Sequence, residues 1–247
     1  MRTSNPVLSR LFSQSSISRS YGQTMTLAGT VNKAFLLLFL VLFTASWTWS
    51  QFIAHGPSSI MAWMLGGGIA GFIAALVTMF KPQLAHVSAP VYALAEGLFL
   101  GGLSSIFEAR YPGIVIQSVG LTFGTLFCLL WAYKSGFIQV TERFKMGVVA
   151  ATGAVALMYI LSFILSLFGV NMSFIQGSGL FSIGLSLVIV GIAALNLVLD
   201  FDYIDSGIRQ GAPAQMEWLG AFGLMVTLVW LYVEMLRLLS KLRERQN

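Results

Sequence analysis

Charged residues are scarce in this sequence, and the scarcity decides the class of protein. Only 9% of the 247 residues are Asp, Glu, Lys or Arg, whereas 57% are hydrophobic. A soluble domain carries about 25% charged residues, so this chain has too few to cover its surface against water. The composition excludes an ordinary soluble protein and predicts an integral membrane protein surrounded by a lipid bilayer.

Cysteine and histidine are nearly absent as well. Cys128 is the single cysteine, which excludes an intrachain disulfide and disfavours a cysteine-based metal site. The two histidines, His55 and His86, stand alone in predicted loops and are more typical of surface residues than of ligands. The sequence also lacks HExxH, GxSxG and phosphate-loop motifs. We therefore expect neither enzymatic activity nor a cofactor.

The formal net charge of +5 does not come from a basic domain, because much of it lies at the two ends of the chain. Residues 1–33 are rich in Ser, Thr and Arg and contain no acid, which predicts a flexible basic cytoplasmic tail. An organelle transit peptide is the alternative for such a segment. With no folded basic domain, we expect no nucleic-acid partner. Eight basic residues flank the apolar region: Arg2, Arg10, Arg19, Lys33, Arg237, Lys241, Arg243 and Arg245.

Long apolar runs separated by short polar breaks fill the rest of the chain. A helix needs about 20 apolar residues to cross a bilayer, so the runs predict about seven transmembrane helices. The fold class is therefore an all-α polytopic bundle, with a membrane domain over 34–240 and a basic C-terminal tail over 241–247. The expected spans are Ala34–Ile53, Ile60–Phe80, Val87–Phe107, Ile114–Tyr133, Met146–Phe168, Leu180–Leu199 and Trp218–Leu239.

Loop charges predict the orientation. Because cytoplasmic loops are enriched in Lys and Arg, we expect the N-terminus in the cytoplasm. The first three loops on the other side then carry only Arg110. An odd number of spans, however, places the basic C-terminal tail outside, so either the seventh helix is re-entrant or short, or the tail is tolerated there. The loop charges on the predicted cytoplasmic side are Lys81, Lys134, Arg143, Lys145 and Arg209.

Acidic residues inside the predicted spans are the candidates for function, because each costs roughly 2.5–3.5 kcal/mol at mid-helix. Glu96 has no cation nearby in the sequence, which favours a functional or interhelical role. Glu234 lies three residues before Arg237, so a plain intrahelical ion pair is the alternative to a functional role. Asp200 and Asp202 are two residues apart and point to different sides of a helix. Asp205, by contrast, is expected to be solvated at the interface.

The last two spans resemble the Bax inhibitor-1 (TMBIM) family. The matching segments are Leu199–Tyr203, reading LDFDY, then Thr227–Tyr232, reading TLVWLY, and the Arg-Leu close in Leu236–Leu239. The glycine-rich third span agrees, and the resemblance covers the chain from about Ala34 onward. It is closest to the bacterial branch usually called Bax inhibitor-1 or YccA-like, which implies the bacterial inner membrane.

This resemblance implies six helices around a central seventh and a pH-sensitive calcium leak controlled by paired aspartates that share protons. Carboxylate oxygens are also natural calcium ligands. Asp202 matches the first aspartate of the pair, whereas Thr227 stands where the second is expected. A replacement carboxylate would come from Glu234 or Glu96.

Two hypotheses follow, the first from the buried acids and the resemblance, and the second from this departure. In the first, the chain forms a regulated path for calcium or other cations, with Asp202 central and Asp200, Glu96 and Glu234 as its candidate partners. In the second, it is a non-conducting adaptor or a modulator of a membrane protease, as some bacterial relatives of the family are. A transporter built from inverted repeats is a weaker alternative, because the sequence shows no such repeat.

Overall fold

The computed structural model describes residues 24–169, 177 and 179–246. Within these residues the regular elements are seven long helices and one short 3-10 helix, which confirms the predicted all-α fold. The first 23 residues, most of the predicted N-terminal tail, lie outside the described part. The helices are α2 (Leu27–His55), α3 (Pro57–Phe80), η1 (Pro82–Leu84), α4 (Ala85–Arg110), α5 (Ile114–Lys134), α6 (Glu142–Leu167), α8 (Leu180–Arg209) and α9 (Met216–Gln246).

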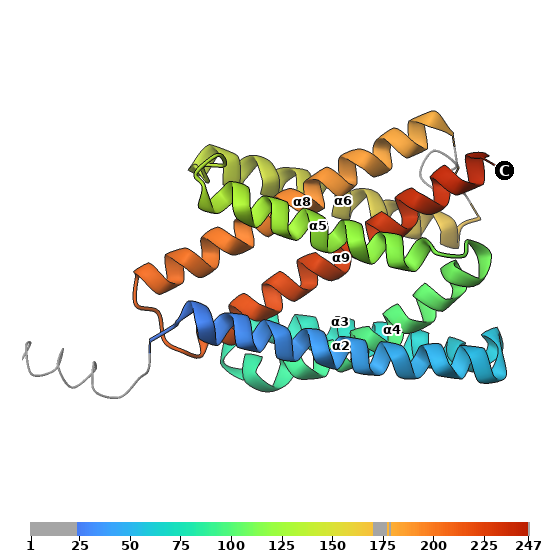
Figure 1. The fold of residues 1–247 in the computed structure, drawn as a ribbon, viewed down its shortest axis with the longest axis horizontal. Coiled ribbons are helices and arrows are strands. Elements are labelled where there is room, and N and C mark those ends of the chain that lie inside the picture. The colour runs from blue at the N-terminus through green and yellow to red at the C-terminus, as the bar shows by residue number, and fades with distance from the viewer. Residues whose placement is uncertain (1–23, 170–176, 178, 247) are drawn as a thin grey trace, which may run out of the picture.

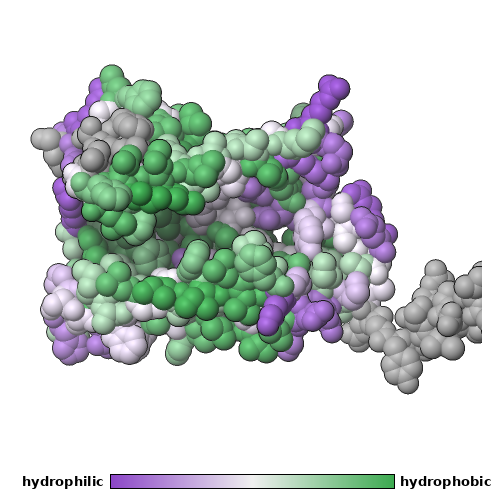
Figure 2. All heavy atoms as spheres, turned by 180° about the vertical axis from the view of Figure 1, so that it is seen from behind, coloured by the Kyte–Doolittle hydropathy of each residue, from purple (hydrophilic) through white to green (hydrophobic). Residues whose placement is uncertain are grey.

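The surface of the bundle suits lipid rather than water. All seven long helices have the length and the apolar composition to cross a membrane. Figure 2 shows hydrophobic side chains over the broad middle of the molecule, with hydrophilic ones gathered at its two ends. Large apolar side chains such as Phe35, Phe72 and Phe127 are about two-thirds exposed. Because soluble proteins rarely expose apolar patches of this extent, these helices form the membrane domain of an integral membrane protein.

The helices form two groups with α9 between them (Figure 1). Helices α2, α3 and α4 pack together, while α8 packs against α5 and α6. Helix α9 contacts α2 and α4 of the first group and α5 and α8 of the second. Two clusters of buried apolar residues hold α9 in place, one centred on Leu37 and Met225 and the other on Leu197 and Leu231. The seventh helix is therefore central, as the resemblance implies.

Glycines permit the closest contacts in the first group. A Cβ on Gly101 of α4 would overlap the backbone of Ala45 in α2, and a Cβ on Gly97 would overlap Thr44 and Val41. Small residues let helix backbones approach each other in lipid, where no hydrophobic force drives helices together. The glycines of the third span therefore serve packing.

Successive helices run back and forth, so the bundle has two polar ends. One carries Lys33, at the start of α2, and the α8–α9 turn; we call it the Lys33 end. There Lys33 forms an ion pair with Glu217 of α9, and the Met25 amide donates to the Ala212 carbonyl oxygen (2.7 Å). The other, the Arg110 end, carries the last turns of α4 and α9. The first and last helices are thus joined at the Lys33 end.

Several helices extend beyond the predicted spans. Helix α8 continues to Arg209, ten residues past Leu199, and α9 continues to Gln246 through most of the segment expected as a tail. The extension of α8 carries its own stabilising contacts. Arg209 pairs with Asp205 one turn earlier (3.2 Å). A span predicted from hydropathy ends at the first charged residues. The observed helix continues past them, because charged side chains such as Arg209 form ion pairs within the helix.

Candidate functional site

A buried carboxylate stands where α8 meets the central helix. The Oδ2 atom of Asp200 is buried and has no hydrogen-bond partner within the described residues. Thr227 of α9 faces this carboxylate and interacts with it. Gly223, one turn before Thr227, lies beside the same carboxylate, since a Cβ on it would lie 3.4 Å from Asp200 Oδ1. The missing side chain leaves space for the carboxylate of Asp200 against α9. The position at which the family pattern expects a second aspartate therefore faces Asp200.

Asp202 points elsewhere, as its spacing from Asp200 predicts. Its Oδ2 lies 3.0 Å from Nζ of Lys145 on α6, and its Oδ1 lies 3.5 Å from the Tyr133 hydroxyl of α5. The same hydroxyl lies 3.4 Å from Oδ2 of Asp205. These contacts join α5, α6 and α8 at the Lys33 end. Asp202 thus has a cationic partner, whereas the buried oxygen of Asp200 has none in the described chain.

Glu96 lies at the contact between α3 and α4. A Cβ on Gly71 of α3 would lie 2.9 Å from its Oε2, so the absence of a side chain there accommodates the carboxylate. In the described part of the chain no hydrogen bond or ion pair is found for Glu96, and no contact links it to Asp200 or Glu234. Glu96, which faces Gly71 of α3, therefore makes no contact with Asp200 of α8 or Glu234 of α9 within the described residues.

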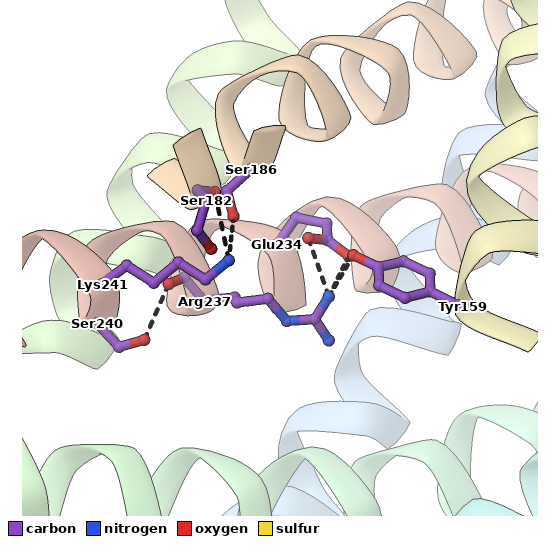
Figure 3. A network of polar contacts seen from close by, with 7 residues as sticks. All are labelled: Tyr159, Ser182, Ser186, Glu234, Arg237, Ser240 and Lys241. Carbon is purple, nitrogen blue, oxygen red and sulfur yellow. Dashed lines mark hydrogen bonds and ion pairs between the residues drawn. The ribbon is translucent and has the colours of Figure 1, made fainter. Parts of the chain in front are cut away.

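Glu234 is the centre of a polar network on α9 (Figure 3). Its side chain is 2% exposed and accepts hydrogen bonds from Nη1 of Arg237 (3.1 and 3.3 Å). It also accepts from the Tyr159 hydroxyl of α6 (2.9 Å), which in turn accepts from Arg237. The guanidinium group stacks over the Tyr159 ring at 4.9 Å. The expected intrahelical pair therefore exists, but α6 completes it.

Lys241 extends this network to α8. Its ammonium group donates to Oγ of Ser186 (2.8 Å) and to the carbonyl oxygen of Ser182 (3.4 Å), and the residue is buried. Lys241 follows Arg237 by four residues and Glu234 by seven, so all three lie on one face of α9. The sequence analysis assigned Lys241 to the tail; its helical spacing from Glu234 was the signal that could have placed it in the bundle.

A cavity of about 490 Å³ opens beside this network at the Arg110 end. Its walls come from the last turns of α4, α6 and α9. Figure 2 shows a hollow between the two helix groups on the face opposite that of Figure 1. The lining residues are Ile106, Phe107, Arg110, Tyr111, Tyr159, Ser162, Phe163, Ser166, Arg237, Ser240, Lys241 and Glu244.

Polar groups thus follow the central helix from one end of the bundle toward the other. Asp200 and Thr227 come first, then the hydrogen bond between Tyr232 and Ser104 of α4 (2.7 Å), and then Glu234 above the cavity. Thr227 and Glu234 are seven residues, or about 10 Å, apart along the helix. Between them Leu231 is completely buried against α8, together with Leu197. No cluster of His, Cys, Asp and Glu suited to a metal occurs among the described residues.

The fold and these intramembrane polar groups define a polytopic helical membrane protein. Residues 5–244 match the family model described as Bax inhibitor 1 like, and the chain belongs to this Bax inhibitor 1-like family. Members of the family are generally non-enzymatic membrane proteins. The comparisons with curated proteins and with solved structures give no match.

Proposed function

We propose that this protein is a regulated leak path for calcium or other cations, in which Asp200 is the carboxylate that faces the ion. The observation that carries the proposal is the buried Oδ2 of Asp200, which has no hydrogen-bond partner within the described residues. An ionisable group inside a membrane protein is costly and marks ion pathways more often than it stabilises a fold. Carboxylate oxygens are the ligands that calcium prefers.

The arrangement around α9 supports a path that is closed in this structure. Polar atoms lie on both sides of the apolar cluster between α8 and α9 that contains Leu197 and Leu231, and both leucines are completely buried. A closed leak needs such a dry segment, because apolar constrictions gate by excluding water. Opening would require α8 to move against α9 at this cluster.

Asp200 takes the role that the resemblance assigned to Asp202. Asp202 has Lys145 as its ion-pair partner and is better suited to hold the Lys33 end of α5, α6 and α8 together. Thr227 offers a hydroxyl oxygen to an ion but cannot titrate. Protonation of Asp200 would therefore set the pH response at this position, and Glu234, tied to Arg237 and Tyr159, would act at the far side of the leucine cluster.

Calcium flux into dye-loaded proteoliposomes, measured from acidic to neutral pH, tests the proposal. We expect the parent to leak calcium with a pH dependence that Asp200→Asn abolishes, because an amide does not titrate. Asp205→Asn is the matched control, since Asp205 is nearly half exposed and pairs with Arg209 on its own helix. Equal pH profiles for the parent and Asp200→Asn would remove Asp200 from the path.

If the parent shows no calcium flux, the Thr227→Asp variant distinguishes two explanations. If that variant leaks with a pH dependence, the path exists and this chain has lost the second carboxylate. Silence from both proteins would contradict the leak and favour the non-conducting adaptor, including a modulator of a membrane protease. Residence in the bacterial inner membrane with the N-terminus in the cytoplasm remains a prediction in either case.

A further inference from the structure

The cavity at the Arg110 end has a charge that a cation path does not explain. Three basic side chains line it, Arg110, Arg237 and Lys241, against one acidic side chain, Glu244. A mouth that gathers cations would carry the opposite balance, because rings of Asp or Glu select cations and rings of Arg or Lys select anions. The lining therefore indicates a different ligand for this cavity.

The basic groups differ in how firmly they are held. Arg110 pairs with Glu244 at 3.6 Å, with the two side chains 68% and 46% exposed, a type of contact that contributes little stability. A ligand can replace it at low cost. Arg237 uses Nη1 for Glu234 and Tyr159, and its other terminal nitrogen points away from both in Figure 3. A guanidinium carries five N–H donors, so donors remain for a ligand.

The position of the cavity indicates the source of the ligand. Arg110 is the last residue of α4, and Ser166 stands one residue before the end of α6, so the cavity lies where these helices leave the apolar core. Apolar side chains, Ile106 and Phe163, share the lining with the charges, and both are exposed. A phospholipid suits both parts of the lining, because its phosphate group can contact the basic side chains and its acyl chains the apolar ones. Basic pockets between transmembrane helices bind lipid headgroups in this way.

We propose that this cavity binds a phosphate-bearing anion, supplied by the headgroup of an anionic phospholipid in the leaflet at the Arg110 end. Arg110 and Arg237 contact the phosphate oxygens through charge-assisted hydrogen bonds, and Lys241, also in the lining, adds positive charge. The acyl chains lie along Ile106 and Phe163. Binding of this anion does not depend on ion conduction, so the proposal stands apart from the proposed leak.

Native mass spectrometry of the full chain, released from micelles after exposure to defined lipids, tests this site. We expect phosphatidylglycerol to be retained in preference to phosphatidylcholine. Arg110→Gln should weaken retention about fivefold, the effect of one basic side chain near a membrane surface. Ser166→Leu should also weaken it, because the added side chain fills the cavity without changing charge. The control is Arg243→Gln, which removes the same charge from a side chain that faces Gln117 of α5 (3.3 Å).

A second arm uses inorganic phosphate in place of the lipid. Inorganic phosphate could stabilise the parent protein but not Arg110→Gln, while the two lipids are retained equally. That result would support an anion site at this cavity and assign it a soluble anion instead of a lipid headgroup. Equal retention of both lipids with no phosphate effect would overturn the proposal. An Arg243→Gln loss as large as that of Arg110→Gln would also overturn it, since the effect would then be one of overall charge.

Discussion

Glu234 and Glu142 make the same local contact in very different surroundings. Each pairs with a basic residue three positions later, Glu234 with Arg237 (3.1 Å) and Glu142 with Lys145 (3.2 Å). The Glu234 side chain is 2% exposed and the Glu142 side chain 84%. Breaking a buried pair leaves an uncompensated charge, whereas water and salt replace an exposed partner.

Glu234→Gln should therefore lower the free energy of unfolding by about 2 kcal/mol or more, since Arg237 and Tyr159 both lose their charged acceptor. Glu142→Gln, the matched control, should change it by less than about 0.5 kcal/mol. Thermal or denaturant unfolding of both variants in the same detergent provides the measurement. Equal stability of the two variants would mean that the network around Glu234 contributes no more than a surface pair.

At the scale of the element, the contact between α2 and α4 depends on a missing side chain. A Cβ on Gly101 would lie 2.7 Å from Cα of Ala45, and backbone cannot move aside as a flexible side chain can. Gly101→Ala should thus destabilise the protein by about 1–3 kcal/mol, the usual cost of overpacking. Gly120→Ala in α5, where a Cβ would meet nothing within 4 Å, is the control. It should be neutral or slightly stabilising, because Ala favours helix more than Gly does. Detergent melting temperatures compare the two, and a loss in both variants alike would contradict the close-packing explanation.

Sequence predicted the elements better than their ends. Lipid demands about 20 apolar residues per helix, so the seven runs were visible without any alignment. The extension of α8 to Arg209 was harder to predict, because only the pair of Asp205 with Arg209 lies within α8, and the contacts with Lys145 and Tyr133 come from other helices. The two-residue spacing of Asp200 and Asp202 did predict that they face different sides, since that follows from helix geometry alone.

At the scale of the whole molecule, the sequence could not predict which side chains on different helices lie opposite one another. The choice between Asp200 and Asp202 as the residue opposite Thr227 depends on how α8 rotates against α9, and single-sequence patterns do not contain that rotation. The network of Tyr159, Glu234 and Lys241 depends on α6 and α8 reaching the far end of α9. Only the part of it within α9 could be predicted from spacing: the pair of Glu234 with Arg237, and the position of Lys241 on the same helix face.

The whole molecule also places its basic residues at two ends, and their partners distinguish these ends. At the Arg110 end, Arg237 pairs with Glu234 and Arg110 with Glu244, while Lys241 is buried in the bundle. At the Lys33 end, Lys145 and Arg209 pair with Asp202 and Asp205, whereas the loop residues Lys81, Lys134 and Arg143 form no ion pair within the described residues. Since loop cations near span ends set orientation, the Lys33 end should face the cytoplasm despite the basic residues that end α9.

Single cysteines test this orientation in a Cys128→Ser background, which removes the exposed native thiol. Ser135→Cys places a thiol in the exposed loop after α5 at the Lys33 end, and Gln246→Cys places one at the last turn of α9. In intact bacterial cells, a membrane-impermeant maleimide should label Gln246→Cys and leave Ser135→Cys unlabelled until the membrane is opened. Because seven helices put their two ends on opposite sides, the reversed pattern would invert the whole bundle and place the anion cavity in the cytoplasmic leaflet. Labelling of neither thiol in intact cells would mean that α9 does not cross the bilayer.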